Sequence, residues 1–84
     1  MSNKQAIFDI IAGHACEVLP ELAGRRWSSL DSLRELGANS IDRAEILMMT
    51  MATLGLRIPL VELAQARNMG ELAEWLAARG AQIV

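Results

Sequence analysis

Residues 36–55 of the chain read LGANSIDRAEILMMTMATLG. In this stretch two short polar residues, Asn39 and Ser40, stand between a glycine and an apolar run that a second glycine closes. A short polar side chain at such a position accepts hydrogen bonds from the free backbone amides of a first helical turn. Asp42 adds negative charge where the helix dipole favours it, and glycine commonly ends a helix. The stretch therefore predicts a helix that begins at Asn39 or Ser40 and ends at about Leu54.

This helix carries two apolar stripes, which follow from a turn of about 100° per residue. One stripe consists of Ile46, Leu47, Thr50 and Leu54, and the other of Ile41, Ala44, Met48 and Met51. A small bundle cannot bury both stripes equally, so we expect the first to face the core and the second to be largely exposed.

Exposed methionine adapts to different partners and recurs at binding surfaces. Together with two acidic neighbours, the second stripe predicts a docking face for partner proteins, made of Ile41, Asp42, Ala44, Glu45, Met48 and Met51. The alternative, that the methionines only fill gaps in the core, stays open for each residue.

The rest of the chain predicts three more helices and one long loop. We expect helices over about residues 3–19, which Pro20 ends, then over 60–66 and over 68–78. Residues 21–38 form the loop, with room for a short helical turn at 31–35. Trp27 and Trp75 are interpreted as anchors of the loop and of the last helix, and Asn68 with Glu71 resembles a capping box.

Composition agrees with a small helical protein. The 84 residues suffice for one domain, spanning 1–84, and 52% are hydrophobic but only 4% aromatic. A core of Ala, Leu, Ile, Val and Met favours helices. The expected fold is therefore all-α: a monomeric four-helix bundle with a long loop between the first two helices and a short third helix.

Several classes of function and location are disfavoured. A net charge of -2 with scattered cations gives no footprint for nucleic acid. No apolar run approaches the roughly 18 residues of a membrane span, and the polar start, Met1 to Gln5, is unlike a signal peptide. Cys16 is the single cysteine, so no internal disulfide can form. We expect a soluble, cytoplasmic protein that binds neither nucleic acid nor membranes.

Ser40 is the residue that points to a function. At the start of a helix after a long loop, its hydroxyl would be accessible to a modifying enzyme, and the helix end would favour an attached phosphate. Taken alone, the simpler interpretation is that Ser40 only caps the helix. However, Leu-Gly-x-x-Ser-Ile at 36–41, Ile-Pro at 58–59 and Gly-Glu-Leu-x-x-Trp-Leu at 70–76 together resemble the acyl carrier protein family, in order and over nearly the whole chain.

This resemblance implies a cofactor and partners. A phosphopantetheinyl transferase would move 4'-phosphopantetheine from coenzyme A onto Ser40, and acyl groups would be carried as thioesters on the terminal thiol. The family usually has aspartate before the serine, whereas this chain has Asn39, and the lost charge would affect which transferase acts.

The stretch at 37–45 resembles a narrower group, the discrete donor carriers of β-branching cassettes in polyketide pathways. There a malonyl acyltransferase loads the carrier, a decarboxylating ketosynthase-like enzyme leaves acetyl, and a hydroxymethylglutaryl (HMG) synthase-like enzyme uses that acetyl. Acceptor carriers typically have a tryptophan in the helix after the serine, and this helix has none. The alternatives are a general polyketide or fatty-acid carrier and an unmodified helical interaction module.

No catalytic or metal site is expected. His14 and Cys16 stand two residues apart, so a helix would point them in different directions, and no second cysteine or histidine completes a metal site. Asp42 with Glu45 is better explained by helix-end electrostatics and docking than by acid–base catalysis. The protein is therefore expected not to be an enzyme.

Overall fold

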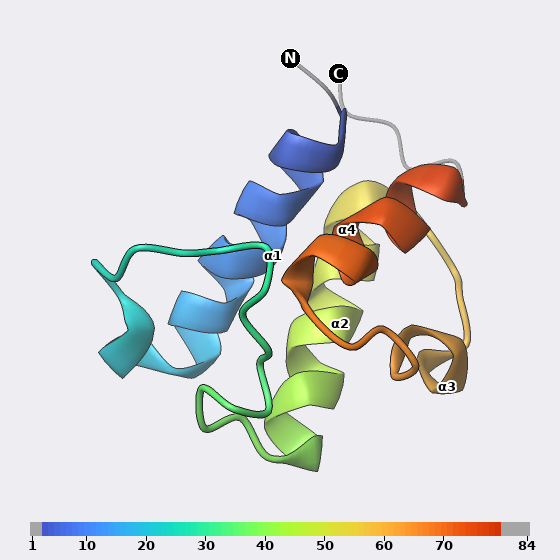
Figure 1. The fold of residues 1–84 in the computed structure, drawn as a ribbon. Coiled ribbons are helices and arrows are strands. Elements are labelled where there is room, and N and C mark those ends of the chain that lie inside the picture. The colour runs from blue at the N-terminus through green and yellow to red at the C-terminus, as the bar shows by residue number, and fades with distance from the viewer. Residues whose placement is uncertain (1–2, 80–84) are drawn as a thin grey trace.

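The computed structural model describes residues 3–79, which are helical with connecting loops and contain no strand. The elements are the helices α1 (Asn3–Val18), α2 (Ser40–Leu54), α3 (Leu60–Leu63) and α4 (Met69–Ala78), with a short 3-10 helix at Pro20–Leu22. Helix α1 packs against both α2 and α4, and α3 packs against α2 (Figure 1). The expected all-α bundle with a long first loop and a short third helix is confirmed.

The boundaries differ from expectation at three places. The long loop opens with the 3-10 helix, since Pro20 suits a first helical turn and Leu22 enters the core. Helix α3 is a single turn, shorter than the expected 60–66: residues 64–65 form a turn, and Asn68 then takes extended backbone to cap α4. Residues 33–37 form turns rather than a helix.

The core is aliphatic and is drawn from every helix. The first stripe of α2 faces it as predicted, and Thr50 joins it because its hydroxyl donates to the Ile46 carbonyl oxygen at 2.8 Å. A polar group can be buried at low cost when its hydrogen bond is made. The other buried side chains include Ile7, Ile11, Leu33, Leu63, Met69, Leu72 and Leu76.

The first turn of α4 holds the long loop in place. The amide of Met69 donates to the carbonyl oxygen of Asp31, and that of Gly70 to the carbonyl oxygen of Ser29, both at 2.8 Å. These amides have no partner within their own helix, so the loop satisfies them. A Cβ on Gly70 would stand 2.9 Å from the Cβ of Ser29, so the close approach requires glycine here.

The two tryptophans pack against different parts of the molecule. Trp27 is half-buried against the core, with the guanidinium of Arg25 at 5.2 Å from its ring centre, so it anchors the loop as expected. Trp75 is also half-buried but lies apart from the core cluster, in a shallow depression shared with Glu62 and Arg79, which form an ion pair. It therefore covers the side of α4 that faces α3.

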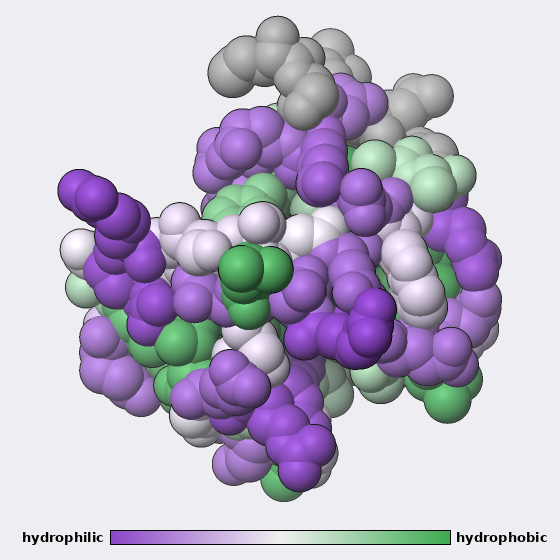
Figure 2. All heavy atoms as spheres, in the orientation of Figure 1, coloured by the Kyte–Doolittle hydropathy of each residue, from purple (hydrophilic) through white to green (hydrophobic). Residues whose placement is uncertain are grey.

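The surface in the orientation of Figure 1 is mostly hydrophilic, with hydrophobic side chains in small separate patches (Figure 2). Among residues 3–79, no helix has the length and apolar character needed to cross a membrane.

Candidate functional site

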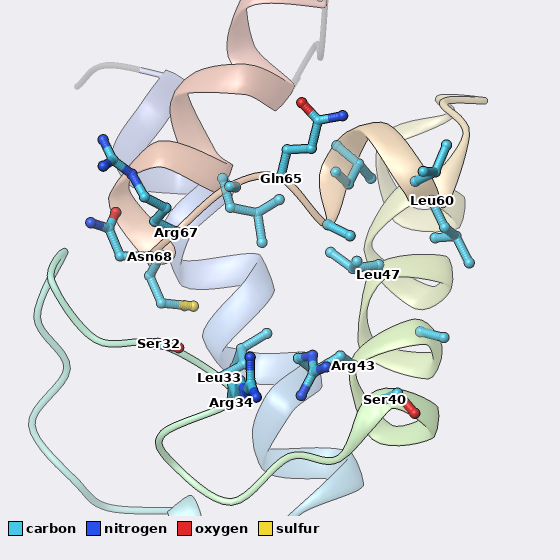
Figure 3. A pocket seen from close by; sticks show the side chains of 17 residues that line it. Ser32, Leu33, Arg34, Ser40, Arg43, Leu47, Leu60, Gln65, Arg67 and Asn68 are labelled. Atoms are coloured by element: carbon cyan, nitrogen blue, oxygen red, sulfur yellow. The ribbon is translucent and has the colours of Figure 1, made fainter.

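The start of α2 settles which residue caps this helix. The Asn39 side-chain oxygen accepts from the Asp42 amide at 2.8 Å, and the Asp42 carboxylate accepts from the Asn39 amide at 3.2 Å. This reciprocal pair is a capping box in which Asn39 is the N-cap. Ser40 is thus the first helical residue, exposed and free of the capping role (Figure 3).

The chain just before Ser40 is held from two sides. Arg43 donates from Nη1 to the Ala38 carbonyl oxygen at 2.7 Å, and the Ala38 amide donates to the Leu33 carbonyl oxygen at 3.0 Å. Gly37 makes the bend possible because it has a φ of 104°, in the left-handed region. This role of Arg43 was not predicted from the sequence. The one indication there was that Arg43 lies one helical turn after Ser40.

A groove of about 600 Å³ begins at Ser40 and runs between the long loop, α2, α3 and the start of α4. Its apolar wall includes Leu47, Leu63, Met69 and Leu72. Arg34 and Arg43 lie at its lower end in Figure 3, the end at which Ser40 begins α2. A flexible chain attached to Ser40 could therefore lie along an apolar surface.

The second stripe of α2 divides between surface and core. Ile41 and Met48 are 76% and 55% exposed, and Glu45 is also exposed. Ala44 is half-buried and lines the groove. Met51 is half-buried as well, because it packs against the core and its sulfur accepts from the Ile58 amide at 3.4 Å.

Met51 therefore packs into the core, as the alternative interpretation of the methionines held, whereas Met48 lies on the surface. Asp42, half-buried, is engaged in the capping box. Sequence reasoning missed Val61 on α3, which is 71% exposed and lines the same groove. The burial of Leu63 leaves Val61 on the outer side of α3. A helix of a single turn is too short to show this as a periodic pattern in the sequence.

The two other candidates, His14 and Cys16, make contacts that hold the bundle together. His14 Nε2 lies 2.8 Å from the Thr53 hydroxyl and so joins α1 to α2, while Cys16 is half-buried against the core. Within residues 3–79, no three His, Cys, Asp or Glu side chains gather in a way that could hold a metal ion.

Known proteins are similar to this chain over most of its length, which includes Ser40 and the helices around it. A family model described as phosphopantetheine attachment site matches residues 9–76. The polyketide biosynthesis acyl-carrier-protein AcpK of Bacillus subtilis (strain 168) is 53% identical over 74 residues, which cover 88% of this chain and 90% of that protein.

A chain in the crystal structure of the curacin biosynthetic pathway HMG synthase in complex with an acetyl donor carrier protein is also similar. It superposes with a TM-score of 0.85 at 47% identity, over 93% of this chain and 99% of that one.

Proposed function

The chain belongs to the acyl carrier protein family, whose members bear covalent 4'-phosphopantetheine, and we propose that Ser40 is the attachment residue of this arm. The observation that carries this proposal is that Asn39 caps α2 while the Ser40 hydroxyl stays exposed at the helix start. The helix dipole favours a phosphate at this end of α2, and the adjoining groove has room for an arm. A carrier of this family presents acyl groups and is not itself an enzyme.

We further propose that the carrier is the acetyl donor to an HMG-synthase-like enzyme in polyketide β-branching. The likeness to a carrier crystallised with an HMG synthase supports this role, as does the similarity to a polyketide carrier. Helix α2 lacks the tryptophan that acceptor carriers typically have. In this role the partners are a phosphopantetheinyl transferase, a malonyl acyltransferase, a decarboxylating ketosynthase-like enzyme and the synthase.

The partner enzymes would approach the face of α2 beside Ser40. Ile41 and Met48 supply exposed apolar area there, and Val61 extends it onto α3. Charges on this face are mixed, since Asp42 and Glu45 flank Arg43. Apolar complementarity should therefore contribute more to docking, and long-range charge steering less, than on a uniformly acidic surface.

The attachment is tested by intact mass after incubation of the apo protein with coenzyme A and a phosphopantetheinyl transferase. The wild type should gain one phosphopantetheine, Ser40→Ala none, and both should keep the same helical circular dichroism. Ser29→Ala is the matched control, because Ser29 is an exposed serine of the long loop. Modification of Ser40→Ala would refute the assignment.

The donor role is tested on the acetylated protein with a cognate HMG-synthase-like enzyme. Acetyl should move from the carrier to the synthase. If the protein is modified at Ser40 but transfers no acetyl to that synthase, the function is that of a general polyketide or fatty-acid carrier.

A further inference from the structure

Two arginines that line the groove beside Ser40 have no ion-pair partner among residues 3–79. Arg34 and Arg43 line it together with Arg67, and its lining includes no Asp or Glu. Arg67 is paired with Glu71 at 3.2 Å. Neither Arg34 nor Arg43 forms an ion pair with a carboxylate of residues 3–79, and the guanidinium of Arg43 donates to the uncharged carbonyl oxygen of Ala38.

This combination of an apolar wall and two guanidinium groups without a carboxylate partner among residues 3–79 fits a particular kind of cargo. A guanidinium presents a planar fork of donors that matches a carboxylate. The apolar wall suits the short methylene chain that leads to such a carboxylate. We propose that Arg34 and Arg43 bind the free carboxylate of a dicarboxylic acyl group, of the malonyl class, carried on this chain's own arm.

The tether makes a weak contact effective. An exposed guanidinium–carboxylate pair contributes little binding free energy when its partners are free in solution. A flexible tether raises the effective concentration to the millimolar range, because binding becomes intramolecular. The bound fraction should therefore be partial and should fall as salt is added, since both arginines are at least partly exposed.

The consequence is that the carrier would distinguish two of its own acyl forms. This inference rests on the proposed donor function. Decarboxylation breaks the bond to the terminal carboxyl group, releases CO2 and leaves an acetyl group once the methylene carbon is protonated. The acetyl form has no carboxylate for the arginines, so its thioester end would leave the groove and become available to the next enzyme.

The experiment compares four forms of the protein: holo, acetyl, butyryl and malonyl, each checked by intact mass. Backbone amide spectra should show shifts at Ala44 and Gln65, which line the groove, in the malonyl form only. The holo form tests whether the arm's own phosphate is the anion that the arginines bind. The butyryl form tests whether apolar contact alone brings the chain into the groove.

A titration of the malonyl carboxyl carbon, labelled with 13C, measures the contact directly. The two nearby cations should lower the pKa of this carboxyl group at low salt. Arg34→Gln should reduce that shift by about half, since one of two cations is removed. Arg43→Lys should also reduce it, because the forked donor is lost. The matched control is Arg26→Gln, which removes an exposed loop arginine that does not line the groove and should match the wild type.

Equal amide shifts in the malonyl form and in the holo or butyryl form would overturn carboxylate recognition, as would an unchanged carboxyl pKa in Arg34→Gln. These results leave the carrier function standing. A protein that gains no phosphopantetheine at Ser40 would instead overturn the proposed function, and this inference with it.

Discussion

Two glycines in helices should respond in opposite directions to the same substitution. Gly70 lies in the first turn of α4, where an added Cβ would stand 2.9 Å from the Cβ and 3.1 Å from the carbonyl oxygen of Ser29. Gly13 lies inside α1, where an added Cβ would meet nothing within 4 Å beyond its chain neighbours and the nearby backbone of its own helix. Alanine at either site improves helix propensity, but only at Gly70 must the long loop move.

The magnitude at Gly70 follows from these contacts. Overpacking a well-filled site costs about 1–3 kcal/mol. Displacing the loop also weakens the bond from Gly70 to Ser29, and a hydrogen bond contributes about 0.5–1.5 kcal/mol. The gain in helix propensity offsets at most about 1 kcal/mol. Gly70→Ala should therefore lower the free energy of unfolding by roughly 1–3 kcal/mol, whereas Gly13→Ala should raise it by roughly 0.5–1 kcal/mol.

Urea denaturation followed by helical circular dichroism measures both changes. The two variants should unfold in single transitions with the slope of the wild type, so that a shift of the midpoint reports stability alone. If Gly70→Ala were as stabilising as Gly13→Ala, the close packing of the loop on α4 would be refuted.

Four other substitutions test the core, the cap and the docking face, and a fifth serves as a control. Leu72→Ala and Leu54→Ala should each cost about 2–5 kcal/mol in urea denaturation, because both side chains are buried, and a neutral effect at both would contradict the bundle core. Asn39→Ala should cost about 0.5–2 kcal/mol by the same measurement, since the capping box is lost, and unchanged stability would assign the cap to another residue. Met48→Glu should impair acetyl transfer to a cognate HMG-synthase-like enzyme while the circular dichroism stays unchanged, because Met48 is exposed beside Ser40. Ala78→Glu, an equal charge change on the exposed end of α4, should transfer acetyl like the wild type, and equal transfer by both variants would exclude Met48 from docking.

Local signals were enough to predict the helices and the position of Ser40. Pro20 and Gly55 end their helices by backbone geometry, and a polar residue before an apolar run begins the next one, whatever lies elsewhere in the chain. The period of α2 also indicated which side faces the core, because a helix with two stripes in a small bundle must expose one of them. The order of motifs then identified the family before any contact was known.

Contacts between segments distant in sequence decided the rest. The sequence left open whether Asn39 or Ser40 caps α2, since both are good caps, and the geometry of the Asn39–Asp42 pair leaves the serine hydroxyl free. Met51 was expected on the surface, but the chain that returns through Ile58 half-buries it. The groove beside Ser40 combines Arg34 of the loop with residues of three helices. No periodic pattern can predict such a surface, because its shape depends on how the separate elements pack.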